Sequence, residues 1–226
     1  MSATKEFHHN EIERGQRAAI DDTRDYPILF DTEMVQAILS GWKTQTRRLF
    51  KLPLSKAMEP AHEIAQDGGE WIARLKNGKC NKHTITCPWG NTGDLLWVKE
   101  TWAPALGDIA YKADYSKTVL SEKRNQGLWH PSIHMAKKDS RLWLQITDIK
   151  AQRIQSITGE EAKAEGIGIA SVLNFSPGDI SCFRAGFYKK WISIYGIESW
   201  HENPWVWAIK FRTCTIKSNY FNHTYK

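Results

Sequence analysis

The segment Gly41–Arg48 concentrates side chains that can act on a carbonyl group or hold an anion. It reads Gly-Trp-Lys-Thr-Gln-Thr-Arg-Arg, so one amine, two hydroxyls and two guanidinium groups follow a glycine directly. A lysine shielded from water, here Lys43, can act as a base or stabilise charge beside a hydroxyl, while Arg47 or Arg48 can bind an anionic or carbonyl group. An edge strand with solvated lysine and arginine explains the same segment, because runs of charge usually lie at the surface.

A short strand and a helix must position this segment. The apolar run Tyr26–Phe30 has strand character, and Asp31 and Thr32 follow it as capping residues. Apolar residues then recur at helical spacing until Gly41, which predicts a helix that stops there. These apolar positions are Met34, Val35, Ile38 and Leu39.

Two further helices are predicted late in the chain. Thr158 and Glu161 have the spacing of a capping box, and Gly166 ends a short helix that contains Glu165. A longer helix begins near Asp179, because four apolar residues fall on one face. They are Ile180, Phe183, Phe187 and Trp191.

Strand patterns outnumber the helices and predict an α+β fold. Leu95–Val98 is a compact buried strand after the turn Gly93-Asp94, and residues 142–147 alternate apolar and polar side chains. In the last strand, alternate residues from Trp205 to Phe211 point one way. A small β-barrel with flanking helices fits this pattern better than a doubly wound sheet, which would alternate strand and helix regularly.

Composition limits the class of protein. The chain has 226 residues, 41% of them hydrophobic and 25% charged, which is typical of one folded domain and excludes overall disorder. No apolar run is long enough to span a bilayer, so we expect a soluble cytoplasmic protein with no membrane partner. A net charge of +6 favours anionic partners such as nucleic acids or nucleotides.

We expect a mobile N-terminal arm over residues 1–25, one domain over 26–214 and a polar tail over 215–226. Residues 51–92 form an irregular insertion with one hairpin around Trp71-Ile72-Ala73.

The order of the motifs resembles the ASCH domain, a family in the PUA-like superfamily of small β-barrels. The matching features are G-x-K-T-x-T-R-R after a helix, a Gly-Asp turn before an apolar strand, I-T-x-E-E-A-x-A-E-G, and a terminal strand of the type W-V-W-A-I-K-F. The resemblance covers roughly Pro27 to Thr213. It implies a PUA-like barrel in which 51–92 and 103–135 are insertions relative to the smallest members.

Small bacterial members of this family are amidohydrolases that remove the acyl group from N4-acetylcytidine and related N4-acylated cytosines. Their catalytic lysine, threonine and glutamate match Lys43, Thr46 and Glu165. The first arginine after the motif matches Arg47, which the resemblance implies as a substrate or oxyanion contact, and we add Arg48 as a second substrate-binding candidate. The resemblance implies amide hydrolysis on a small nucleoside substrate, with no cofactor and no metal.

The chemistry of amide hydrolysis suits these residue types. A nucleophile, a proton acceptor, an oxyanion contact and a proton donor are all required. Lys43 with a lowered pKa can accept the proton of Thr46, and Glu165 can hold the edge of cytosine or pass a proton to N4. Alternatively Glu165 activates water and Thr46 only positions the substrate. We expect alanine at any of the three to remove turnover and leave the fold intact. The competing structural interpretation of Glu165 is a solvated helix residue that pairs with Lys163 or with a neighbouring strand.

Three further residues are candidates for substrate binding. Trp42 and Trp89 lie beside polar or turn residues, where a flat ring can stack on a nucleobase. Glu100, just past the strand Leu95–Val98, would belong to a polar cluster at the barrel mouth. Other tryptophans fall within strand patterns, and we expect them in the core: Trp97, Trp205 and Trp207.

Metal and histidine chemistry are weaker alternatives. Cys80, His83 and Cys87 have a spacing that allows zinc, but none of His62, His130 and His134 is as clear a fourth ligand, so reduced cysteines in a hairpin are favoured. His130 and His134 suggest acid-base chemistry, which the matched triad does not need.

Two functions compete with amide hydrolysis. The same barrel could recognise RNA or a modified base without turnover, its basic residues contacting phosphates or bases, or it could be a ribonuclease with the same basic cleft. Binding to RNA would be sensitive to salt, whereas turnover of a free nucleoside would not.

Overall fold

The computed structural model describes residues 23–50, 63–74, 82–105, 108–115, 128–168 and 181–215. Strands and α-helices follow one another along the chain as β1 (Asp25–Leu29), α2 (Thr32–Leu39), β2 (Gln45–Leu49), β3 (Glu63–Asp67), β4 (Glu70–Arg74), β5 (Lys82–Ile85), β6 (Leu95–Lys99), β7 (Trp102–Ala105), β8 (Asp108–Tyr111), β9 (Trp143–Arg153), α4 (Gly159–Ala164), α5 (Ser181–Tyr195), α6 (Ile197–His201) and β10 (Trp205–Cys214). The predicted α+β class is confirmed.

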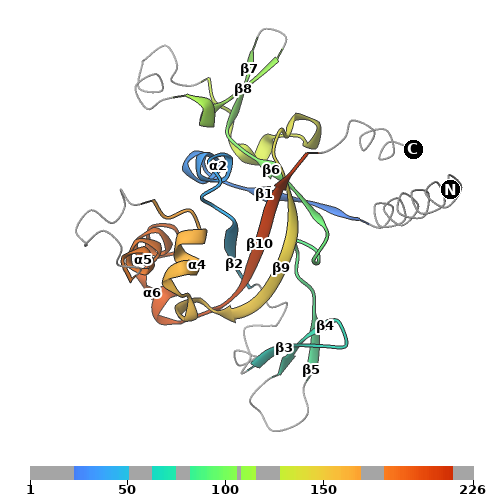
Figure 1. Cartoon of the computed structure of the whole chain (residues 1–226), viewed down its shortest axis with the longest axis vertical. Helices are drawn as coiled ribbons and strands as arrows, with labels where there is room; N and C mark the ends of the chain where they lie inside the picture. Colours follow the sequence, from blue (N-terminus) through green and yellow to red (C-terminus); the bar gives the residue numbers. More distant parts are fainter. Residues whose placement is uncertain are drawn as a thin grey trace, which may run out of the picture.

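The central element is a five-stranded sheet with the order β1-β6-β9-β10-β2 (Figure 1). Only β1 and β6 pair in parallel, and the long strands β9 and β10 pair antiparallel along their whole length, with a bulge between Lys210 and Phe211. Among the described strands this sheet is open, with β1 and β2 at its two edges. A closed barrel therefore stays a prediction.

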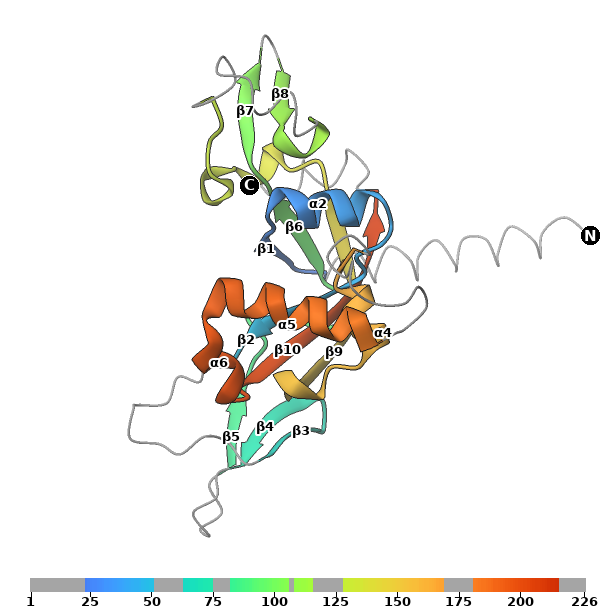
Figure 2. The ribbon, with the colours of Figure 1, turned by 90° about the vertical axis from the view of Figure 1, so that its left-hand side faces the viewer.

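Both faces of the sheet are buried at β10. Trp207, Ile209 and Phe211 join the larger apolar core, as their predicted alternation requires. Val206, which directly precedes Trp207 and so faces the other way, joins a second core with Phe187 of α5 and other residues of the helical side. Figures 1 and 2 show α4, α5 and α6 grouped against one side of the sheet, with α2 beside them.

Caps confirm the predicted boundaries of α2 and α4, whereas the predicted start of the long helix near Asp179 lies outside the described residues. The Asp31 carboxylate accepts from the Met34 amide at 2.8 Å, and α2 is followed by Gly41 with φ +76°. Thr158 and Glu161 form the reciprocal capping box of α4, which is closed by Gly166 at φ +84°. Glu165 is the C-cap of α4 rather than a residue of its last turn.

The two insertions carry their own small sheets. The predicted hairpin around residues 71–73 belongs to a three-stranded sheet β3-β4-β5, and the second insertion contains the hairpin β7-β8. Both project from the central sheet in Figure 2. The first 22 residues of the predicted arm and residues 216–226 of the predicted tail lie outside the described residues.

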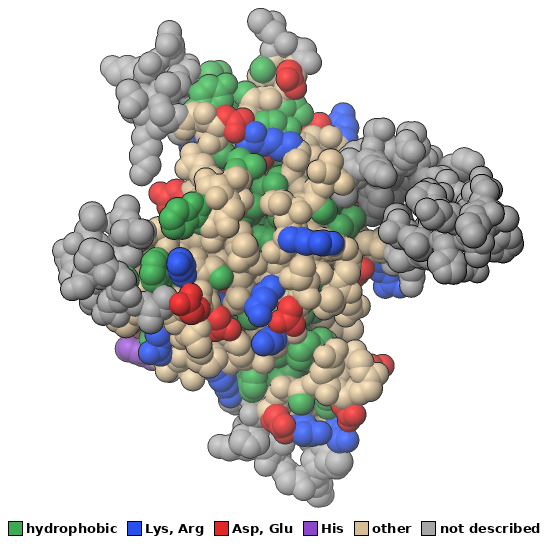
Figure 3. All heavy atoms as spheres, in the orientation of Figure 1, with side chains coloured by type: hydrophobic (Ala, Val, Ile, Leu, Met, Phe, Trp, Pro, Cys, Tyr) green, Lys and Arg blue, Asp and Glu red, His purple; other side chains and the backbone are tan. Residues whose placement is uncertain are grey.

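Within the described ranges, no helix is both long and apolar enough to cross a bilayer. The face in Figure 3 carries lysine and arginine side chains intermixed with aspartate and glutamate. Trp97 differs from its predicted core position: it is only half-buried, and the Lys99 ammonium lies 5.4 Å from its ring centre.

Candidate active site

Two segments that are distant in sequence meet at the start of β2. Lys43 and Glu165 form an isolated antiparallel bridge, and the Thr44 amide donates to the Ala164 carbonyl at 2.9 Å. The Thr44 carbonyl accepts from the Phe211 amide of β10, also at 2.9 Å. The end of α4 is therefore fixed against β2, and a lysine and a glutamate 122 positions apart share one site.

Lys43 is buried, with 3% of its surface exposed. Its Nζ donates to the carbonyls of Gln45 and Glu165 at 2.7 and 2.8 Å, and to Glu165 Oε2 at 3.1 Å. Burial lowers the pKa of Lys43 from its ordinary value of 10.5, and the attraction of Glu165 opposes that shift only in part. Lys43 thus loses its proton more readily than a solvated lysine, as a base must.

Glu165 accepts from a different cation on each carboxylate oxygen. Lys43 reaches Oε2, and Arg47 Nη1 donates to Oε1 at 2.9 Å. Arg47 Nη2 donates to Glu161 Oε2 at 2.8 Å, and the same oxygen accepts from the Thr158 amide in the capping box. Charges of opposite sign alternate along this chain of contacts, which holds the Glu165 carboxylate in one orientation.

This burial corrects two expectations. Glu165 is 4% exposed, so its interpretation as a solvated residue is wrong, and its partners are Lys43 and Arg47 at the neighbouring strand β2 rather than Lys163. Removing one partner of a buried ion pair typically costs about 3–5 kcal/mol, because the other charge is left uncompensated. Alanine at Lys43 or Glu165 is therefore expected to destabilise the fold as well as to change the site.

A cavity of about 110 Å³ adjoins these ion pairs, and we call it the Lys43 cavity. Thr46 lines it and is 4% exposed, and its hydroxyl makes no hydrogen bond to another residue in the described ranges. Cationic side chains outnumber anionic ones in the lining, which favours a ligand group that carries or develops negative charge. The charged lining residues are Lys43, Arg47, Arg48, Lys190, Asp31 and Glu165.

An aromatic wall on α5 closes one side of the Lys43 cavity. Phe187, Trp191 and Tyr195 are spaced four residues apart, and all three line the cavity. The Phe187 and Trp191 ring centres are 6.0 Å apart, and those of Trp191 and Tyr195 are 4.4 Å apart. The sequence predicted Phe187 and Trp191 as one helix face but did not connect that face to the site. The continuation of the spacing to Tyr195 was the available signal.

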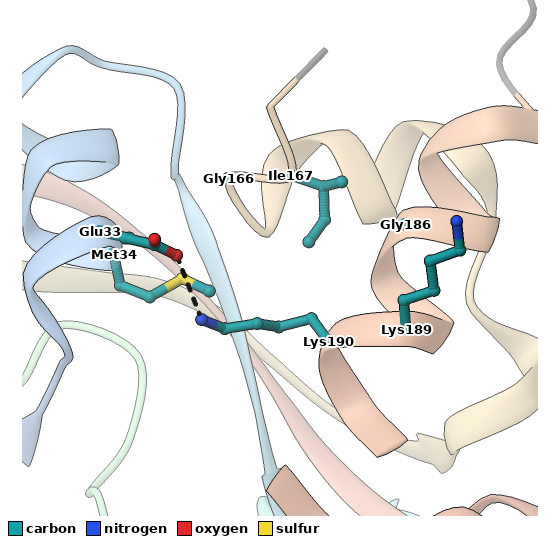
Figure 4. Close-up of a pocket in the computed structure, with 7 residues that line it drawn as sticks. All are labelled: Glu33, Met34, Gly166, Ile167, Gly186, Lys189 and Lys190. Carbon is teal, nitrogen blue, oxygen red and sulfur yellow. Dashed lines mark ion pairs between the residues drawn. The ribbon is translucent and has the colours of Figure 1, made fainter. Parts of the chain in front are cut away.

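A second cavity of about 250 Å³, the α2–α5 cavity, adjoins the first and shares Met34, Ile167 and Lys190 with it. Figure 4 shows Lys190 reaching from α5 toward Glu33 on α2, and their charged atoms are 3.5 Å apart. The Asp31 carboxylate also holds Lys190, at 2.9 Å. Together the two cavities reach the lower end of the size range of small-molecule sites, roughly 300 Å³.

Three predicted substrate-binding residues do not line the Lys43 cavity. Trp42 is 54% exposed at the turn after α2, and Trp89 packs against the larger core. Glu100 is 1% exposed and accepts two hydrogen bonds from Arg141, at 2.9 and 3.0 Å. Burial raises the pKa of Glu100, and Arg141 opposes the shift. Glu100 therefore belongs to a structural ion pair with Arg141 that lies away from the Lys43 cavity.

The cysteine and histidine candidates lie away from the cavity lining as well. No group of three potential metal ligands occurs within the described ranges, and Cys80 lies outside them. Burial raises the pKa of Cys87 to about 11, so its side chain is a neutral thiol near pH 7. The His130 ring packs on Trp102, with ring centres 5.0 Å apart.

Comparisons with known proteins add no family to this description: no family model matches the chain, and no curated protein or solved structure is significantly similar to it.

Proposed function

We propose that the protein is an amidohydrolase that removes the N4-acyl group from N4-acetylcytidine and related N4-acylated cytosine nucleosides. The observation that carries the proposal is the lining of the Lys43 cavity: the unengaged Thr46 hydroxyl lies in the same small space as a buried lysine of lowered pKa and a fixed carboxylate. Nucleophile, base and charge stabiliser are the groups that amide hydrolysis requires.

The proposed fold is a PUA-like barrel of the ASCH type, working in the cytoplasm. Arg48 Nη2 of β2 donates to the Leu29 carbonyl at the end of β1, so the two edge strands of the open sheet are linked by a side chain. That contact supports a sheet curled toward closure.

In the proposed reaction, Thr46 Oγ1 attacks the acyl carbonyl and its proton passes to neutral Lys43. Cationic Lys43 directs its three N–H groups at three acceptors, so neutral Lys43 gives up one of these contacts and turns its lone pair to the Thr46 hydroxyl to receive the proton. Collapse of the tetrahedral intermediate breaks the bond between the acyl carbon and N4, and Lys43 returns the proton to the leaving amine. Water then hydrolyses the acyl-threonine, releasing the carboxylic acid.

Glu165 has the positioning role in this scheme. Its two oxygens already hold Lys43 and Arg47, and a carboxylate has further lone pairs with which to accept from the N–H edge of the ligand. The aromatic wall on α5 offers flat surface for a pyrimidine ring.

The test compares the parent with Thr46→Val on N4-acetylcytidine, with cytidine release followed by chromatography. Valine keeps the shape and removes a hydroxyl that has no described partner, so we expect turnover to fall by about a thousandfold or more while the melting temperature changes little. Thr46→Ser retains a hydroxyl and should retain part of the turnover.

Three outcomes decide between mechanisms and functions. Turnover by Thr46→Val at the rate of the parent would exclude an acyl-threonine and favour water activated by Glu165. Absence of turnover by the parent on any N4-acylated cytosine would refute the proposal. Tight, salt-sensitive binding of RNA oligonucleotides without turnover would then favour the binding module.

A further inference from the structure

Arg48 differs from the other cations that line the Lys43 cavity. Lys43 and Arg47 share Glu165, and Lys190 is held by Asp31 and Glu33. Within the described ranges, no carboxylate lies within ion-pair distance of Arg48. Its positive charge is therefore the one that the cavity leaves available to a ligand.

The hydrogen-bond donors of Arg48 are also largely unused. A guanidinium carries five N–H donors. One contact, from Nη2 to the Leu29 carbonyl, engages them within the described part of the chain, and Nε is buried without a partner. The central carbon of the guanidinium lies 5.0 Å from the centre of the Phe30 ring. A buried N–H without an acceptor is unfavourable, and the Nη1 and Nη2 N–H groups that no described residue engages can donate to an oxygen of a ligand.

The carboxylates whose charge acts on Arg48 already form ion pairs with other cations. Glu165 is engaged by Lys43 and Arg47, and Asp31 holds Lys190 while capping α2. Burial lowers the pKa of Arg48, and Tyr195, Glu165 and Asp31 counteract this only in part. An incoming anion would supply the missing compensation.

We propose that Arg48 forms an anion subsite in the Lys43 cavity, so that the preferred ligand carries a phosphate or carboxylate group. Given the proposed function, on which this identification of the substrate rests, the substrate is an anionic N4-acylated cytosine compound rather than a neutral nucleoside. The anionic oxygens are either on a ribose phosphate or at the far end of the acyl chain. The adjoining α2–α5 cavity, lined by Lys189 and Lys190, gives the additional space that such a substrate needs.

The first experiment measures binding without chemistry. Titration calorimetry compares cytidine, cytidine 5′-monophosphate and inorganic phosphate on the parent, Arg48→Gln, Arg48→Lys and Lys150→Gln. Lys150 is exposed on β9, so its variant has the same change in net charge away from the cavity. We expect Arg48→Gln to weaken binding of the two phosphates at least tenfold and to leave cytidine binding nearly unchanged. Arg48→Lys should restore only part of the affinity, because it lacks the planar fork.

The second experiment distinguishes the source of the anion by kcat/KM. The parent protein is assayed with three substrates: N4-acetylcytidine, its 5′-monophosphate and N4-succinylcytidine. This comparison does not depend on whether a variant folds. If kcat/KM for the monophosphate exceeds that for N4-acetylcytidine at least tenfold, the subsite binds phosphate. If kcat/KM for the succinyl compound does so, the subsite binds the carboxylate of the acyl chain. Equal kcat/KM for all three, with phosphate affinity unchanged in Arg48→Gln, would overturn the inference while leaving the amidohydrolase standing. Phosphate binding that depends on Arg48, without turnover of any substrate, would uphold the anion subsite and refute the proposed function.

Discussion

Replacement of Lys43 by methionine tests whether the buried ion pair both stabilises the fold and forms the site. Methionine fills the space of the lysine stem but carries no charge and no N–H donor. The substitution removes three hydrogen bonds, two to backbone carbonyls and one to Glu165 Oε2, from a side chain that is 1% exposed.

The size of the effect follows from those contacts. A buried acceptor that loses its donor costs about 1–3 kcal/mol, and a charge-assisted hydrogen bond contributes about 1.5–3 kcal/mol. Glu165 keeps Arg47, and the ammonium no longer has to be desolvated, so part of the loss is offset. We expect a net destabilisation of about 3 kcal/mol, which for a domain of this size lowers Tm by roughly 6–12 °C.

Urea unfolding followed by tryptophan fluorescence gives the free energy, with Lys150→Met as the matched control. Lys150 is exposed and its ion-pair contact with Asp148 is 3.9 Å, so its loss should change stability by less than about 0.5 kcal/mol. A double variant, Lys43→Met with Glu165→Leu, should be more stable than the summed single effects predict, because the two side chains are in contact. If Lys43→Met unfolds at the same urea concentration as Lys150→Met, the reasoning from burial is wrong.

Three further predictions follow from the same geometry. The pKa of Lys43 is lower in the folded than in the unfolded chain, so the unfolded chain binds more protons between that folded pKa and 10.5, and the stability of the parent relative to Lys43→Met should rise with pH across this window. In parallel, kcat/KM should rise with pH and level off below 10.5 as Lys43 becomes neutral; a flat profile would exclude Lys43 as the base. Gly166→Ala places a Cβ 2.9 Å from Lys43 Cβ and 3.0 Å from Ala37 Cβ at a φ of +84°, so it should cost more stability and activity than Gly41→Ala, which has φ +76° and open space. Equal melting temperatures for the two alanine variants would contradict the predicted clash.

The sequence alone determined the features that depend on close neighbours along the chain. A helix cap needs a side chain within three residues of the amide it satisfies, so Asp31 and the pair Thr158 and Glu161 could be identified directly. A strand whose alternate residues are apolar is equally local, and the pattern identified β10 and the beginning of β9, which continues past the predicted residues 142–147 to Arg153. Lys43 and Thr46 entered the candidate site as members of one short motif.

Only the tertiary structure decided how those side chains are used. Glu165 is buried and paired because the end of α4 docks on β2, a contact between segments far apart in sequence that no local pattern encodes. The same docking commits Arg47 to two glutamates, whereas Arg48 pairs with none in the described part of the chain, although the two arginines are adjacent and chemically identical. Glu100 likewise pairs with Arg141 and does not line the Lys43 cavity. Residue type fixes what a side chain can do, whereas burial and the nearest opposite charge decide what it does, and both of these depend on how the chain folds.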